Sequence, residues 1–163
     1  MTKPRFLVDA MLGSLARWLR ILGFDAAYDS ATEDADLVEI ARGQSRVLLT
    51  RDRRLIQRRI LRDTADSHLL IREDGIEHQL RQVIDELGLE VRASRLFGRC
   101  LRCNTELDTL PAAQAQEHVP PFVARTQNGF RRCPSCERIY WSATHVDAMV
   151  ARLRSMGIEA RSC

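Results

Sequence analysis

Four of the five cysteines fall into two Cys-x-x-Cys pairs, a residue type and spacing typical of zinc sites. The pairs are Cys100–Cys103 and Cys133–Cys136, with residues 104–132 between them. Each pair places two thiolates on one tight turn, and two such turns supply four sulfur ligands at about 2.3 Å around a tetrahedral Zn²⁺. The sequence therefore predicts a structural zinc site, because four protein sulfurs leave no position for water.

Other interpretations of these residues stay open at this stage. Redox Cys-x-x-Cys pairs usually stand at a helix start beside a βαβ unit, and these pairs lie outside the predicted βαβ region. His118 and His145 are alternative metal ligands, although four thiolates already complete a site. Cys163 is left over and has no predicted role.

Aspartates form a second candidate site, because they stand where predicted strands end and predicted helices begin. Asp9 follows the apolar residues 6–8, and Asp52 closely follows the run Val47–Thr50, whose residues are apolar or β-branched. Asp34 and Asp36 open the helix that precedes this run. In a parallel sheet, strand carboxyl ends and helix amino ends share one edge, so these carboxylates could converge there.

Converging carboxylates bind Mg²⁺ or Mn²⁺ through oxygen. Such an ion stabilises charge on a phosphodiester and activates a water molecule for in-line attack. In the alternative interpretation, Asp34 is only a helix cap, Asp36 is a surface acid and Asp9 is a turn residue. A phospho-receiver site is disfavoured because no lysine follows Lys3, and a haloacid-dehalogenase-type phosphatase is disfavoured by Met11.

The elements that must position these residues follow from apolar periodicity and from caps. The pattern predicts strands at 6–8, 25–28, 46–50 and 68–71, and helices at 11–22, 34–43, 51–62 and 76–87. This alternation predicts an α/β domain with a mainly parallel sheet and helices on both faces. We expect a domain boundary near residue 95, with units at 1–95 and 96–163.

Charge and composition limit the classes of function that the sequence is compatible with. The net charge is only +3, but the positive charge is concentrated locally. Residues 51–62 contain six arginines and a single acidic residue, Asp52. Arginine binds phosphate through a planar fork, so this stretch predicts either an RNA-binding surface or an ordinary solvated helix face. No apolar run is long enough to span a membrane and no signal-peptide pattern is present, so we expect a cytoplasmic protein.

Several stretches resemble the Mut-seven C-terminal RNase domain, a branch of the PIN-like nucleases. They are FLVDAMLGSLARWLRILGFD, DADLVEIA and RVLLTRDRRL, followed by RCLRCN, CPSC and RIYWSATH, which are similar to the zinc ribbon of that family. The resemblance covers nearly the whole chain and departs at Ala143, where the family usually has glycine. It implies a PIN-like three-layer α/β fold followed by a small zinc ribbon.

The resemblance also implies metal-dependent cleavage of RNA. Asp9, Asp34 and Asp52 match the acidic motif of the family, Asp36 is a further candidate, and the candidates for a fourth acid are Glu73 and Asp74. We therefore expect a ribonuclease that acts on single-stranded RNA, with a structural Zn²⁺ and a catalytic Mg²⁺ or Mn²⁺. The alternatives are a non-catalytic RNA-binding or adaptor module with the same zinc ribbon, and a toxin-like nuclease.

Arginines outside the acidic set are the expected RNA contacts. In the first unit they are Arg17, Arg20, Arg51, Arg53 and Arg54. The ribbon would extend this surface through Arg99, Arg102, Arg131 and Arg132. Trp141 is a candidate to stack on a base or, alternatively, to form the core of the ribbon.

Overall fold

The computed structural model describes residues 3–28, 34–57, 68–141 and 144–161, without the side chains of residues 34, 35, 144 and 145. The first part of the chain alternates strands and helices: β1 (Arg5–Val8), η1 (Ala10–Leu12), α1 (Gly13–Ile21), β2 (Asp25–Tyr28), α2 (Asp34–Gly43), β3 (Val47–Thr50), α3 (Arg53–Ile56), β4 (His68–Leu70) and α5 (Ile76–Glu86). The second part contains η3 (Ala93–Arg95), β5 (Asp108–Leu110), α6 (Ala112–Ala115), α7 (Pro121–Thr126), β6 (Phe130–Arg132), β7 (Ile139–Trp141) and α8 (Thr144–Ser155).

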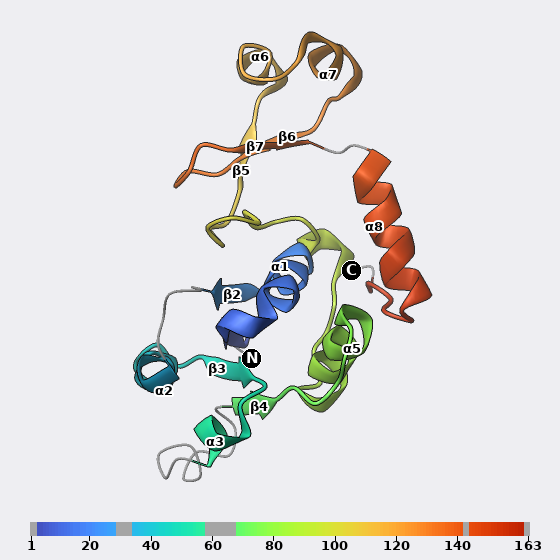
Figure 1. The fold of residues 1–163 in the computed structure, drawn as a ribbon. Coiled ribbons are helices and arrows are strands. Elements are labelled where there is room, and N and C mark those ends of the chain that lie inside the picture. Colours follow the sequence, from blue (N-terminus) through green and yellow to red (C-terminus); the bar gives the residue numbers. More distant parts are fainter. Residues whose placement is uncertain (1–2, 29–33, 58–67, 142–143, 162–163) are drawn as a thin grey trace.

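The first four strands form a parallel sheet in the order β2-β1-β3-β4. Alternate residues of a strand point to opposite faces. Phe6 and Val8 of β1 therefore pack in the core that α1 and α5 cover, whereas Leu7 packs with α2 on the other face. Figure 1 shows this arrangement of helices about the sheet. The expected α/β fold with a parallel sheet flanked by helices is confirmed.

The strands β5, β6 and β7 form a separate antiparallel sheet. We call residues 98–141 the ribbon; at its far end α6 and α7 cover a small apolar core (Figure 1). Phe130 is the central side chain of this core, and Trp141 packs against it while keeping part of its surface exposed.

The C-terminal helix α8 leaves the ribbon and returns to the first part of the chain (Figure 1). Leu153 and Met156 join the core that contains α1 and α5. The Arg152 guanidinium carbon lies 5.5 Å from the centre of the Trp18 ring, within the range of a cation–π interaction. Arg161 then donates its backbone N–H to Val91 O at 2.9 Å. The helix α8 therefore packs against the first part of the chain. The predicted boundary near residue 95 stays a prediction.

No helix within the described ranges is both long and apolar enough to cross a membrane. The predicted arginine-rich helix at 51–62 is described only as α3, which ends at Ile56. Arg58, Arg59 and Arg62 lie outside the described residues.

Candidate active site and metal centre

Asp9 and Asp52 lie at the carboxyl edge of the parallel sheet, at the ends of the neighbouring strands β1 and β3. Val8 is in register with Leu49, and the Asp9 N–H donates to Leu49 O at 3.0 Å. The backbone ladder thus continues one residue beyond β1 and fixes Asp9 beside β3. Asp52 stands two residues beyond the last residue of β3. Both aspartates thus stand at one edge of the sheet, and the convergence of their carboxylates on a shared ion stays a prediction.

The hydroxyl of Thr50 connects the two aspartates. It donates to Asp9 Oδ2 at 2.7 Å and accepts the backbone N–H of Asp52 at 3.0 Å. Thr50 is completely buried, so this hydroxyl has little freedom to find other partners. Sequence reasoning missed this residue, which we counted only as the β-branched end of a strand. The sequence does contain a signal for it: Thr50 is a hydroxyl residue at the end of a buried strand, directly before the charged pair Arg51-Asp52.

The Asp9 carboxylate is buried, yet no described side chain of opposite charge pairs with it. Asp9 is only 4% exposed. Its other oxygen, Oδ1, accepts a long hydrogen bond of 3.4 Å from Met11 N. Within the described part of the chain, neither Asp9 nor Asp52 forms a salt bridge with an arginine, lysine or histidine. Buried charges in proteins are normally paired or bound to metal, so this carboxylate fits a site for a cation.

Asp52 has a structural task besides any chemistry. Its Oδ1 caps α3 by accepting the Arg54 N–H at 2.7 Å. The neighbouring Arg51 has no described salt bridge with Asp9 or Asp52 and pairs with the exposed Asp74 at 2.7 Å. Asp74, one of two candidates for a fourth acid, is therefore engaged in an ion pair. Glu73 is exposed.

The remaining predicted acids are not brought into this pair by any described contact. Asp34 begins α2, but its side chain is outside the description, so its predicted role stays a prediction. Asp36 is exposed on α2. Among the described side chains, only the four paired cysteines form a group of three or more that could hold a metal ion.

The predicted RNA-binding arginines divide into two kinds. Arg17, Arg53 and Arg54 are exposed, as a surface role requires. Arg20 is only 5% exposed. Its guanidinium donates from Nε to Ala26 O at 2.9 Å and from Nη1 to Leu101 O and Arg102 O at 2.9 and 3.1 Å. Arg20 is therefore a poor candidate for an RNA contact, and it instead joins α1 and β2 to the ribbon.

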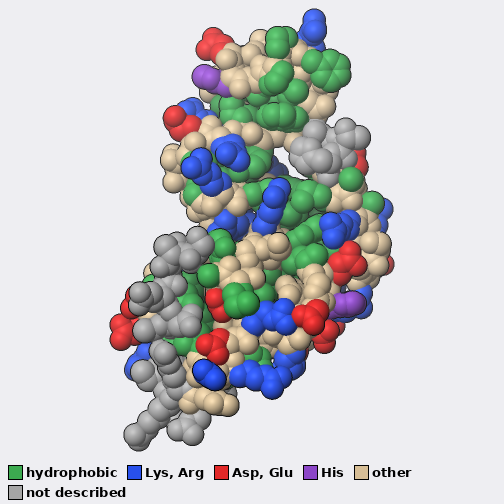
Figure 2. Space-filling view, viewed as in Figure 1, with side chains coloured by type: hydrophobic (Ala, Val, Ile, Leu, Met, Phe, Trp, Pro, Cys, Tyr) green, Lys and Arg blue, Asp and Glu red, His purple; other side chains and the backbone are tan. Residues whose placement is uncertain are grey.

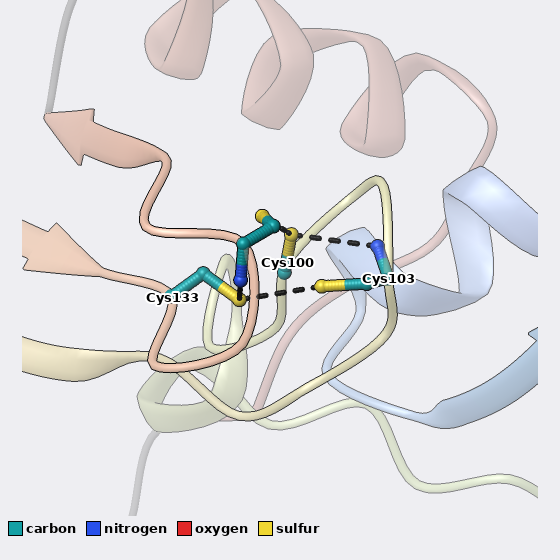
Figure 3. Close-up of side chains that lie close together, drawn as sticks. Cys100, Cys103 and Cys133 are labelled. Carbon is teal, nitrogen blue, oxygen red and sulfur yellow. Dashed lines mark hydrogen bonds between the residues drawn. The ribbon is translucent and has the colours of Figure 1, made fainter.

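The four paired cysteines meet between two loops, and all their sulfurs lie within 4.8 Å of one another. Cys100 Sγ is 3.6 Å from Cys136 Sγ, and Cys103 Sγ is 3.3 Å from Cys133 Sγ. Figure 3 shows sulfurs from the two loops directed toward a common centre. The four cysteines could therefore hold a zinc ion, as the sequence predicted. The exposed His118 is not part of this group.

The two cysteine turns have the same backbone design. In each, the N–H of the second cysteine points at the sulfur of the first at 3.5 Å. The next residue, Asn104 or Glu137, has a positive φ of 67° or 60° and donates its N–H to the carbonyl of the first cysteine. Asparagine tolerates this conformation readily, whereas glutamate does not. The strain at Glu137 is accepted where it closes a turn that directs two sulfurs inward.

The surroundings shift the pKa values of Cys133 and Cys103 in opposite directions. Burial raises the pKa of Cys133 to about 11. For Cys103, burial also acts to raise the pKa, but hydrogen bonds from Thr105 and the neighbouring thiols outweigh it and lower the pKa to about 6. The Tyr140 hydroxyl lies 3.1 Å from Cys100 Sγ and accepts the Leu101 N–H. This tyrosine therefore fixes the first cysteine turn against β7.

A second polar link joins the first cysteine turn to the edge strand β2. Asn104 accepts the Ala26 N–H at 3.0 Å and donates to Asp25 Oδ1 at 2.7 Å. Asp25 in turn pairs with Arg46 at 2.6 Å. Burial would raise the pKa of Asp25, but the hydrogen bonds from Arg46 and Asn104 outweigh burial and lower it.

This lowered pKa predicts an acid-sensitive contribution to stability. A carboxyl whose folded pKa is depressed stabilises the fold above its unfolded pKa, near 4, and loses this effect as pH falls through the folded value. Asp25→Asn should therefore lower the free energy of unfolding by about 1.5–3 kcal/mol at pH 7. The difference from wild type should shrink below pH 4 or so. Urea unfolding at several pH values checks this, with the exposed Asp108→Asn as control. A constant difference down to pH 3 would contradict it.

The comparisons with known proteins agree with this architecture. The family model described as the Mut7-C RNAse domain matches residues 4–153. The chain therefore belongs to the Mut7-C RNAse domain family, which confirms the resemblance seen in the sequence. No curated protein and no solved structure gave a significant match. The family suggests a nuclease-like function and RNA as the substrate class.

Proposed function

We propose that this protein is a metal-dependent ribonuclease that hydrolyses phosphodiester bonds in single-stranded RNA at the carboxyl edge of its parallel sheet. The observation that carries the proposal is the buried Asp9 carboxylate, which has one short hydrogen bond, from Thr50, and no cationic partner among the described residues. A buried carboxylate without a positively charged partner is costly unless a cation compensates its charge. Membership in an RNase family supports the proposal, because a divalent cation at this carboxylate could take part in RNA cleavage.

Asp9 and Asp52 would hold Mg²⁺ or Mn²⁺, with Asp34 as the proposed third acid and Asp36 as an outer candidate. Asp9 keeps Oδ1 available apart from its long contact with Met11, and Asp52 has no described hydrogen bond at Oδ2. When bound, such an ion stabilises negative charge on the phosphodiester and lowers the pKa of a water molecule. The protein supplies the geometry, because Thr50 holds the Asp9 carboxylate against the backbone of Asp52.

The exposed arginines near this edge would bind and orient the RNA backbone. Arg53 and Arg54 follow Asp52 directly, and the cap that Asp52 forms on Arg54 N fixes the course of the chain there. Arg51 is held by Asp74 and would contribute less free charge. The cysteine cluster would bind a structural Zn²⁺, since four thiols fill the coordination sphere of a tetrahedral ion.

A cleavage assay on end-labelled RNA tests the proposal. The zinc-loaded protein should cleave a single-stranded RNA when Mn²⁺ or Mg²⁺ is added, and a chelator should stop the reaction. The same sequence in a duplex should be cleaved more slowly. Cleavage that is unaffected by removal of divalent cations would contradict the proposed mechanism, and the absence of cleavage with any divalent cation would favour a binding role instead.

A further inference from the structure

Two adjoining hollows are lined by the ribbon and α8, the first of them also by α1, and neither is lined by Asp9 or Asp52. The first has a volume of about 350 Å³ and is lined by residues of α1, the first cysteine turn, β7 and α8. The second, of about 500 Å³, lies over the ribbon sheet. Both are lined by Phe97, Tyr140, Trp141 and Val146. The two hollows therefore adjoin at Trp141, and we call them together the cleft.

The lining of this cleft combines positive charge with aromatic surface. Arg17, Arg102 and Arg138 line the first hollow, and none of the described residues that line either hollow carries a carboxylate. None of these three arginines forms a salt bridge within the described ranges of the chain. All three are exposed, in contrast to Arg99, which lines the same hollow but pairs with Glu106. Figure 2 shows Lys and Arg side chains next to hydrophobic ones at the waist of the molecule.

The aromatic wall of the cleft is held in place. The Tyr140 hydroxyl is fixed by Cys100 Sγ and by the Leu101 N–H, both at 3.1 Å. Trp141 packs with one part of its surface on the ribbon core and keeps another part exposed. It therefore serves the core and still offers a surface to a ligand. A fixed aromatic side chain beside arginines that have no described salt bridge is the combination with which many proteins bind single-stranded nucleic acid.

We propose that this cleft binds single-stranded RNA, with a base stacked on Trp141 and neighbouring phosphates bound by Arg17, Arg102 and Arg138. The inference rests on the proposed function, because it takes RNA as the substrate class. Arg17 lies on α1, whose first turn follows Asp9 and η1, so this helix connects the cleft with the acidic pair. The cleft would hold the strand at a distance from the bond that is cleaved.

This inference gives a reason for the way the ribbon is attached. The first hollow needs α1, the cysteine turn and α8 to be in fixed positions at once. Arg20 joins α1 to the cysteine turn, and the packing of Leu153 and Met156 joins α8 to the first part of the chain. The ribbon and the nuclease part would therefore form one RNA-binding surface, which neither part could form alone.

The test measures RNA affinity by fluorescence anisotropy, with the full zinc-loaded chain carrying Asp9→Asn and Asp52→Asn and without divalent cations, so that no RNA is cleaved. Arg17→Ala and Arg138→Ala should each weaken binding and reduce the slope of log affinity against log salt by about 0.7, the value for one phosphate on a single strand. Arg42→Ala and Arg125→Ala change the same charge at exposed positions outside the cleft and should leave both quantities unchanged.

Tryptophan fluorescence gives a second readout. RNA binding should quench the emission, and Trp141→Phe should remove most of this change, because the remaining Trp18 is buried. Trp141→Leu should weaken binding by roughly 5- to 150-fold if the base stacks as proposed. The arginine variants are at exposed sites, so they keep the test valid even if Trp141→Leu disturbs the ribbon.

Three outcomes would overturn the inference. The first is equal affinity and salt slope in the cleft variants and their controls. The second is loss of zinc, measured by metal analysis, in the arginine variants, which would mean that these charges only compensate the thiolates. The third is equally tight binding of polyglutamate with the same dependence on Arg17 and Arg138. Failure of the proposed function would look different, because the cleft would then bind RNA while the unmodified protein cleaved none.

Discussion

Replacing both Asp9 and Asp52 with asparagine is expected to lower Mn²⁺-dependent cleavage of single-stranded RNA by more than about 100-fold, while RNA affinity measured without divalent cations is retained. Loss of a group that only supports a metal ligand typically costs 10- to 100-fold, and the loss of two direct ligands should cost more. The substitution preserves shape, and an asparagine oxygen at position 9 can still accept the hydroxyl of Thr50. The expected defect is therefore in cation binding and not in folding.

The matched control for this experiment changes the same number of charges elsewhere. Asp85 on α5 and Asp108 on β5 are both exposed, so Asp85→Asn combined with Asp108→Asn should leave cleavage unchanged. The rate constant of RNA cleavage should be measured under single-turnover conditions with saturating protein, so that a change in RNA affinity does not affect it. Equal degradation of RNA by the Asp9/Asp52 variant and the unmodified protein would indicate a contaminating nuclease and defeat the proposed mechanism.

The second large effect is expected at the cysteine cluster. Protein purified without added metal should contain about one zinc per chain, and Cys100→Ser combined with Cys133→Ser should abolish it. Both residues are completely buried, and apparent zinc-binding free energies of about 10–16 kcal/mol in small zinc domains are folding free energies. The ribbon should therefore lose its structure, with faster amide hydrogen exchange across residues 98–141.

Loss of the ribbon structure should also destabilise the first part of the chain, because Arg20 joins the two. If the first cysteine turn unfolds, this buried guanidinium loses the carbonyls of Leu101 and Arg102 and keeps only that of Ala26. Exchange should therefore also rise in α1 and β2, whereas β3 and β4 should stay protected. Cys163→Ser is the control, because that residue has no predicted role. Unchanged zinc content in the double variant would show that the ligands are wrongly assigned.

The sheet and the cysteine cluster could be predicted because their signals are local. Short apolar runs gave β1, β2, β3 and β4 nearly at their observed bounds, and an aspartate start and a glycine end gave α2 at Asp34–Gly43. The turns at the paired cysteines are equally local. The helices α6 and α7 were not predicted, although prolines mark where they begin: Pro111 and Pro120 directly precede the first helical residues, and α7 has a proline in its first turn, where proline is tolerated.

The long-range contacts could not be predicted from a single sequence. Arg20 meets Leu101, 81 residues away, and an arginine on an amphipathic helix is expected at the surface. The only indication that Arg20 is buried was its position on α1, where it lies nearer to the apolar stripe than Arg17 does. Val146, Met149 and Leu153 have helical spacing, but nothing in that spacing indicates that α8 packs beside α1 and α5. The cleft depends on both contacts, so it could be found only in three dimensions.

The most direct test of the central claim is a titration of the zinc-loaded protein with Mn²⁺, in which free Mn²⁺ is measured by electron paramagnetic resonance. The account predicts saturable binding that is lost in Asp9→Asn and in Asp52→Asn, weakened about 10- to 100-fold in Thr50→Val, and retained in Thr50→Ser. Equally tight Mn²⁺ binding by the unmodified protein and both aspartate variants would contradict the claim that these two carboxylates share a cation.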